Sequence, residues 1–167
     1  NFFEKEIKTI KKKYKKFIFF PSSFSLYNKN LEWEYKNKLK ICYPQKNQNF
    51  LDKKLNEIIK TLKDSEKDYD KLREVLYNFA VSNPNINIIF RKHPRDDIVE
   101  IKKKFINFPK NVILDHSFSV SPWIIACHIY MHSGCTTSLE AAVLRKKIIT
   151  FIPHRNDELC VFFKTFG

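Results

Sequence analysis

Five short and largely apolar runs recur along this chain, and helical patterns separate them. The runs are FIFF (17–20), INIIF (86–90), NVIL (111–114), HIYMH (128–132) and KIITFI (147–152). Strands that are apolar on both faces are typical of a parallel sheet covered by helices, and their alternation with helices favours the same arrangement. The sequence therefore predicts an α/β fold, a doubly wound Rossmann-like parallel sheet of about five strands with helices on both faces.

The longest helical pattern lies between the first two runs. Apolar residues recur every three or four positions from Leu51 to Phe79, which predicts one long helix with a potential break at Asp64 and Ser65. Residues 21–50 are polar and aromatic, and they indicate a long loop with one short helix. Four further helices are expected: residues 96–106, the segment after Ser121 and Pro122, residues 137–144, and a helix that begins at Asp157.

A chain of 167 residues with 43% hydrophobic residues is long enough for one domain with a proper core. We expect a basic helix or linker over residues 1–15 and a Rossmann-like domain over residues 16–167. The chain starts at Asn1 rather than Met and stops at Gly167 inside an expected helix, so we expect a fragment of a longer protein. No apolar stretch approaches the roughly 20 residues that span a bilayer.

The net charge of +13 fits several kinds of partner. Such an excess can indicate nucleic acid, an anionic membrane surface or an acidic substrate. The simpler explanation is codon bias, because the abundance of Lys, Asn, Ile, Phe and Tyr is what AT-rich codons produce. The one basic cluster, IKTIKKKYKK (7–16), lacks the interleaved aromatics of a single-strand binder. Composition thus favours codon bias, keeps peripheral membrane contact as an alternative and disfavours nucleic acid.

The cysteines indicate a reducing environment. None of the pairs formed by Cys42, Cys127, Cys135 and Cys160 has CxxC spacing, so neither a zinc site nor a redox motif is expected. A cytoplasmic location fits best, with the inner face of the membrane as an alternative place.

Polar residues that follow the strands are the candidates for a site, because an open parallel sheet binds ligands outside the carboxyl ends of its strands. Histidine and arginine recur among them. They comprise Ser22, Ser23, Phe24 and Ser25; Arg91, His93 and Arg95; Asp115 and His116; residues 132–137; and His154, Arg155 and Asn156.

The segment HSGCTTSLE (132–140) carries one of the two glycines of the chain. Gly134 allows a sharp turn between the fourth strand and a helix, and the amides of residues 135–137 at the helix start suit a phosphate. Glu140 lies one turn further on. Its carboxylate could accept hydrogen bonds from a ribose, or it could close a capping box with Thr137. A nucleophilic Cys135 is a weaker alternative, since no His–acid pair at fixed spacing completes a hydrolase.

The segment RKHPR (91–95) is the second candidate element. Pro94 ends the strand, so His93 is held at the sheet edge. An imidazole beside two guanidinium groups prefers to be neutral, which suits a hydrogen bond to a phosphate or a base. The alternative is a basic surface turn around a structural histidine.

Three segments carry a resemblance to a known family: FIFFPSSFSLYN (17–28), IIFRKHPRDD (88–97) and the stretch from NVILDHS to IITFIP (111–153). They resemble the bacterial surface carbohydrate biosynthesis family and, more broadly, are similar to the C-terminal nucleotide-binding half of GT-B glycosyltransferases. The resemblance implies that His93 and Pro94 meet the cytidine or phosphate of a CMP-sugar. It also implies that Ser133, Thr136 and Thr137 meet the phosphate, and that Glu140 binds ribose if the donor is a UDP-sugar.

The leading hypothesis is a nucleotide-sugar-binding domain of a glycosyltransferase that builds surface polysaccharide. Its partners would be a CMP- or UDP-sugar, a glycan or lipid-linked acceptor, and an N-terminal acceptor domain. We expect no cofactor and no metal, because cations and helix-start amides can take a metal's place. No catalytic residue is assigned. The candidate binding residues are Arg91, His93, Pro94, Arg95, His132, Ser133, Gly134, Cys135, Thr136, Thr137, Glu140 and His154.

Two other functions remain open. A non-hydrolysing nucleotide-sugar epimerase has a similar architecture but needs carboxylates around the sugar, and Asp115 and Glu140 are few. A non-catalytic scaffold of a glycan-assembly complex is the other.

Overall fold

A computed structural model of the chain describes residues 2–22, 29–94 and 96–151. The strands are β1 (Phe17–Pro21), β2 (Asn87–Arg91), β3 (Val112–Leu114), β4 (Ile129–His132) and β5 (Lys147–Thr150). The helices are α1 (Glu4–Tyr14), α2 (Lys29–Cys42), α3 (Gln48–Ser82), α4 (Ile98–Lys104), α5 (Val120–Ala126) and α6 (Thr137–Val143). Each of the five apolar runs in the sequence contains a strand, which confirms the predicted α/β class.

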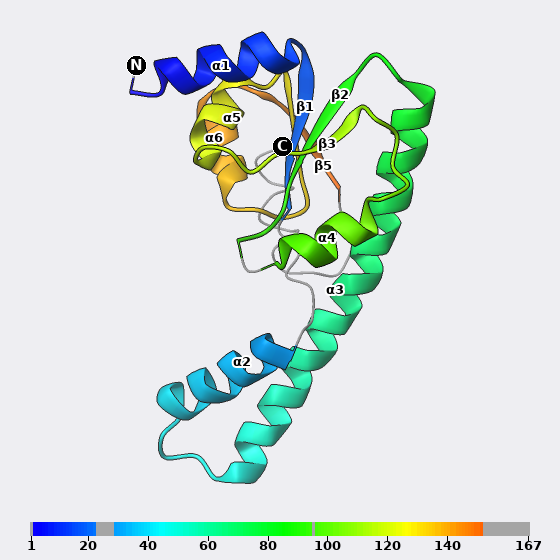
Figure 1. Cartoon of the computed structure of the whole chain (residues 1–167). Helices are drawn as coiled ribbons and strands as arrows, with labels where there is room; N and C mark the ends of the chain where they lie inside the picture. The colour runs from blue at the N-terminus through cyan, green and yellow to red at the C-terminus, as the bar shows by residue number, and fades with distance from the viewer. Residues whose placement is uncertain (1, 23–28, 95, 152–167) are drawn as a thin grey trace. The chain divides into compact units, whose positions relative to one another are not determined.

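The five strands form one parallel sheet in the order β3-β2-β1-β4-β5. The chain builds outward from β1 to β3 on one side and then from β4 to β5 on the other, so the order reverses between β1 and β4. Helices α1, α5 and α6 cover one face, and α4 lies on the other (Figure 1). The doubly wound, Rossmann-like arrangement is therefore confirmed, with its switch point between β1 and β4.

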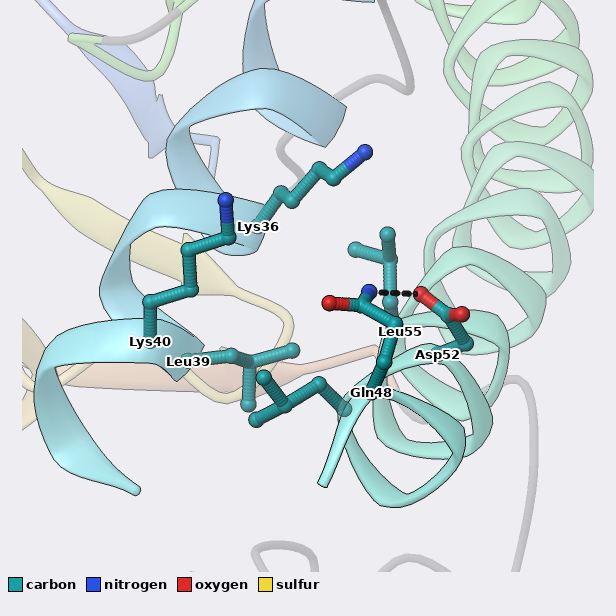
Figure 2. Close-up of a pocket in the computed structure, with 7 residues that line it drawn as sticks. Lys36, Leu39, Lys40, Gln48, Asp52 and Leu55 are labelled. Carbon is teal, nitrogen blue, oxygen red and sulfur yellow. Dashed lines mark hydrogen bonds between the residues drawn. The ribbon is translucent and has the colours of Figure 1, made fainter. Parts of the chain in front are cut away.

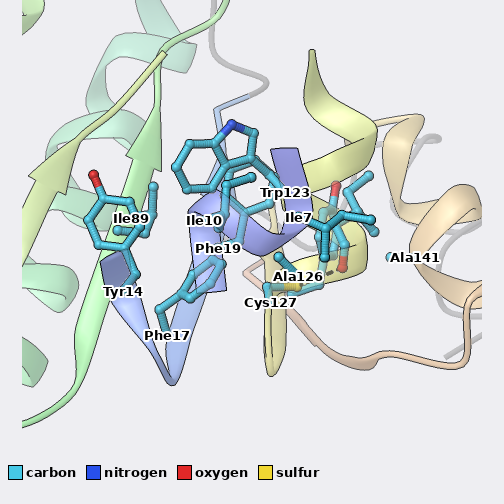
Figure 3. Packing of buried hydrophobic residues seen from close by; sticks show 12 residues of the cluster. Ile7, Ile10, Tyr14, Phe17, Phe19, Ile89, Trp123, Ala126, Cys127 and Ala141 are labelled. Carbon is cyan, nitrogen blue, oxygen red and sulfur yellow. Dashed lines mark hydrogen bonds between the residues drawn. The ribbon is translucent and has the colours of Figure 1, made fainter. Parts of the chain in front are cut away.

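Trp123 of α5 is the centre of the core on the α1 side. Its ring stacks on Phe19 with the centroids 5.8 Å apart and meets Phe17 edge-on at 6.0 Å. The indole Nε1 donates a hydrogen bond to the carbonyl of Ser117 at 2.6 Å, which satisfies the one polar atom of a fully buried side chain. Figure 3 shows this cluster. On the opposite face Phe90 packs against Phe105 at 4.7 Å.

Helix α1 is part of this core. Ile7, Ile10 and Tyr14 follow one another at steps of three and four residues, so they share one face of the helix, and all three are buried among the residues around Trp123 (Figure 3). The expected boundary between residues 15 and 16 separated this helix from the domain. The structure instead places α1 inside it, because an amphipathic helix next to an open sheet face buries its apolar stripe there.

The chain divides into two compact units. The sheet unit comprises Asn1–Ser23 and Leu72–Gly167, and the hairpin unit comprises Phe24–Lys71. In the hairpin unit α2 takes up much of the stretch expected to be a loop. Leu39 of α2 packs against Leu51 and Leu55 of α3, and a hydrogen bond of 2.7 Å joins Gln48 to Asp52 beside them (Figure 2).

Helix α3 is continuous over 35 residues, so the break considered at Asp64 and Ser65 does not occur. Neither residue forbids a helix, and Lys67 stabilises this turn through an ion pair of 3.1 Å with the Asp64 carboxylate. Across the described ranges no helix combines the length and the apolar character needed to cross a membrane.

Candidate functional site

Two of the candidate segments meet at one edge of the sheet. Strand β2 ends at Arg91 and leads into His93, while β4 ends at His132 and leads into the turn at Gly134. Both strands are paired to β1 in parallel, so both segments lie at the carboxyl edge with only β1 between them. Two strand spacings of about 4.8 Å put these strand ends about 10 Å apart. The sequence placed these residues on one rim, and the topology agrees.

Gly134 adopts a φ of +86°, which L residues with a side chain rarely take. No atom lies within 4 Å of the position that a Cβ would occupy there. The glycine therefore serves the backbone conformation of the turn and is not needed to avoid a clash.

The buried imidazole of His132 holds this turn from inside. Its Nδ1 accepts a hydrogen bond of 3.1 Å from the amide of Gly134, and its Nε2 lies 3.1 Å from the hydroxyl of Thr150 on β5. Burial lowers the pKa of His132 to about 4, so the ring is neutral and carries its proton on Nε2. Both ring nitrogens are engaged within the protein, which gives His132 a positioning role at the turn.

The residues after Gly134 divide into internal and exposed groups. The Thr137 hydroxyl lies 2.6 Å from the Tyr130 hydroxyl and 2.8 Å from the thiol of Cys135, so it faces the protein. Thr136 is exposed, and its side chain makes no capping hydrogen bond to α6. Ser138 is 4% exposed, and within the described part of the chain its hydroxyl has no hydrogen-bond partner. The sequence does not single out Ser138 as a site residue, because a serine inside a helix pattern carries no distinct signal.

Glu140 is exposed on α6, and its carboxylate accepts a hydrogen bond of 3.1 Å from Ser121 of α5. The N-cap of α6 is Thr136, whereas a capping box with Glu140 would need Thr137 in that position. Glu140 therefore links two helices at this side of the sheet instead of capping its own.

Arg91 anchors the loop that follows β3. Its guanidinium donates hydrogen bonds to the carbonyls of Ser117, at 3.2 Å, and Phe118, at 2.9 Å. Phe118 has a φ of +63°, so the arginine stabilises a turn that is strained at that residue. Burial lowers the pKa of Arg91 and the nearby Asp115 raises it, but a guanidinium stays charged at any ordinary pH.

The His-Pro turn is held by both of its neighbours. The Lys92 ammonium donates to the carbonyls of His93, at 3.2 Å, and Pro94, at 3.3 Å. The buried Asp96 accepts from the amide of His93 at 3.3 Å, and the Asp96 amide donates to the His93 carbonyl at 3.0 Å. These contacts fix the backbone that carries the half-buried imidazole.

Asp115, at the end of β3, is engaged on both oxygens. Its Oδ1 accepts from the amide of Ser117 at 2.9 Å and from the hydroxyl of the same serine at 2.5 Å. Its Oδ2 accepts from Lys13, at 3.2 Å, and from the Tyr14 hydroxyl. Burial raises the pKa of Asp115, but the hydrogen bonds from Ser117, Tyr14 and Lys13 outweigh it and lower the pKa to about 2. The carboxylate is therefore ionised and committed to the fold.

His116 follows Asp115, and neither of its ring nitrogens has a hydrogen-bond partner among the described residues. Burial lowers the pKa of His116, and the charges of Lys92 and Arg91 lower it further. A neutral imidazole with one unused donor and one unused acceptor thus lies at the same edge as the His-Pro turn.

Several candidates lie outside the described residues: Ser23, Phe24, Ser25, Arg95, His154, Arg155 and Asn156. Over residues 2–22, 29–94 and 96–151, no three His, Cys, Asp or Glu side chains come close enough to hold a metal ion.

The chain matches no model of a protein family, and no curated protein and no solved structure shows significant similarity to it.

Proposed function

We propose that this chain is the donor-binding domain of a GT-B-like glycosyltransferase of bacterial surface polysaccharide biosynthesis, which takes its sugar from a CMP- or UDP-sugar. One observation carries the proposal: the His-Pro turn and the Gly134 turn flank β1 at the switch point of the sheet, where doubly wound folds bind nucleotides. The resemblance of the segments that form these two turns supports it.

In this proposal the nucleotide phosphate lies at the Gly134 turn. The backbone amides that follow Gly134 and the exposed Thr136 hydroxyl would donate hydrogen bonds to its oxygens. The hydroxyl of Ser138, buried and without a partner in the described chain, is one further donor close in sequence. The imidazole of His93 would bind from across β1, on a backbone that Lys92 and Asp96 hold.

Transfer breaks the bond between the anomeric carbon and the phosphate oxygen, and the electron pair stays on the leaving nucleotide. The acceptor hydroxyl forms the new carbon–oxygen bond and gives its proton to a base, which we expect from an acceptor domain. The charges of Arg91 and Lys92 at this edge would stabilise the negative charge that develops on the phosphate. We expect the reaction in the cytoplasm, since the cysteine spacing favours a reducing environment.

The state of Asp115 argues against an epimerase. An epimerase needs carboxylates around the sugar ring, and both oxygens of Asp115 are already bound by Ser117, Lys13 and Tyr14. The Glu140 carboxylate, at this side of the sheet, accepts one exposed hydrogen bond, from Ser121. It therefore remains able to bind a ribose.

Calorimetric titration of the chain with CMP, UDP and their sugars tests the proposal. We expect binding of one nucleotide class, and we expect His93→Ala to weaken it about 10-fold or more, the loss of one hydrogen bond to a charged group. Asn85→Ala is the control, because this exposed polar residue lies just before β2, at the opposite edge and outside either proposed site. The proposal fails if no nucleotide binds, or if Asn85→Ala weakens binding and His93→Ala does not.

A further inference from the structure

A second basic site lies at the opposite edge of the sheet, where the strands begin. It is an open pocket of about 370 Å³, lined by Lys11 of α1, by residues 125–128 at the end of α5, and by residues 144–147 where β5 starts. Ligand sites commonly have volumes of about 300–1,000 Å³. The pocket belongs entirely to the sheet unit.

The pocket is strongly electropositive. Burial lowers the pKa of His128, and the charges of Lys16, Lys146 and Lys11 lower it further, so three ammonium groups act on one imidazole. Arg145 and Lys147 line the same pocket. Positive charges gathered in a concavity raise the local concentration of anions.

Structural needs account for only one of these cations. The Lys146 ammonium donates hydrogen bonds to the carbonyl of Ile125 at 2.7 Å and to that of Cys127 at 3.0 Å. It thereby satisfies backbone carbonyls at the carboxyl end of α5, which have no partner within the helix. Lys11, Arg145 and Lys147 are exposed, and their charged groups form no ion pair or hydrogen bond with any other described residue. Their charges are available to a ligand.

Arg145 occupies its place at a conformational cost. Its φ is +51°, a left-handed conformation that glycine or asparagine adopts more easily. Lys15, just after α1, has a φ of +53°. Glycine or asparagine would be less strained at both positions, so two cationic side chains stand at strained backbone positions that precede strands at this edge.

We propose that the pocket around Lys11, His128, Arg145 and Lys147 binds a phosphate group of an anionic ligand, independently of the carboxyl-edge site. The exposed Lys11, Arg145 and Lys147 neutralise the phosphate, and Lys146 stays bound to α5. The same chemistry is presented by a free phosphate ester and by the headgroup of an anionic lipid.

The test measures binding to two probes with the full chain. Pyrophosphate is titrated by calorimetry, and vesicles of phosphatidylcholine with or without phosphatidic acid are tested by co-sedimentation. Lys11→Gln/Lys147→Gln removes two pocket charges, and Lys102→Gln/Lys110→Gln removes the same net charge from exposed positions of and after α4. We expect the pocket variant to weaken binding about 10-fold and the control variant to change it less than about 2-fold.

Each outcome decides the matter. Binding of pyrophosphate alone identifies a free ligand, and binding of phosphatidic acid vesicles identifies a lipid headgroup, provided that the pocket variant is selectively weakened. Equal weakening by both variants would show that net charge alone attracts the probe, and the proposal would then be wrong. If neither pyrophosphate nor phosphatidic acid vesicles bind, the proposal is also wrong.

Discussion

The hydroxyl of Tyr14 donates a hydrogen bond to the carboxylate of Asp115, which lies 101 residues further along the chain. Through this bond the end of α1 holds the loop that follows β3, and Asp115 in turn holds Ser117. The same loop receives Arg91 from the end of β2. A helix that looks like a basic N-terminal extension thus supports the carboxyl edge on which we place the nucleotide site.

Tyr14→Phe should lower the free energy of unfolding by about 1.5–3 kcal/mol, the value of a hydrogen bond to a charged group. The ring contacts with Phe17 and Trp123 would remain, so the hydroxyl alone is tested. Urea denaturation measures the change. Tyr43→Phe, at an exposed tyrosine of the hairpin unit, is the control and should stay within about 0.5 kcal/mol of wild type. Equal effects of the two variants would contradict the structural role of Tyr14.

The Asp115 carboxylate should make stability depend on pH in the acid range. Its pKa is lowered to about 2, so its contribution is present above the unfolded pKa near 3.8 and is lost as the pH falls through 2. We expect Asp115→Asn to cost about 1–2 kcal/mol at pH 5, after allowance for solvent screening, and less at pH 2.5. Denaturation at both pH values checks this, and a cost independent of pH would argue against an ionised Asp115.

His132 should remain neutral far below the usual range of histidine. Its pKa is about 4 in the folded chain and near 6.5 in the unfolded chain. Between these pH values the unfolded chain binds a proton that the folded chain does not, so this residue lowers stability as the pH falls from 6.5 to 4. Nitrogen NMR of the imidazoles should show one ring that stays neutral, with its single proton on Nε2, down to about pH 4. His132→Gln assigns that signal. A His132 ring that titrates near 6.5 would refute the buried hydrogen-bonded state.

Replacement of Gly134 should reveal conformational strain without steric clash. Open space surrounds the position of a Cβ, so Gly134→Ala should cost about 1–2 kcal/mol through its positive φ alone. Gly134→Asn should cost less, because asparagine tolerates this conformation better. Unfolding free energies of the pair decide it: if Ala is as stable as Gly, the turn does not need a left-handed residue.

Ile10→Ala tests whether α1 belongs to the domain. Ile10 is 1% exposed among the residues around Trp123, so its truncation should cost about 2–5 kcal/mol. Lys12→Ala, on the exposed side of the same helix, should leave the unfolding free energy nearly unchanged. A linker would tolerate both substitutions equally, and that result would restore the boundary at residue 15.

The sequence alone determined the five strands, their parallel arrangement and the edge that carries His93 and Gly134. These features depend on local patterns: a run of apolar residues pairs as a buried strand wherever it lies, and residues after parallel strands share one edge by geometry. The periodicity of α3 was equally readable, because every residue of a helix is placed by its near neighbours.

Only the tertiary structure decided what the polar side chains contact. In the sequence, Asp115 and Arg91 are polar groups at strand ends with no evident partner. In the structure, Lys13 and Tyr14 donate hydrogen bonds to Asp115. Arg91 donates to the carbonyls of Ser117 and Phe118. Such contacts join residues up to 102 positions apart, and the path of the chain, which no local pattern encodes, brings them together. The division into a sheet unit and a hairpin unit has the same origin, since it depends on which apolar faces find each other after the helices have formed.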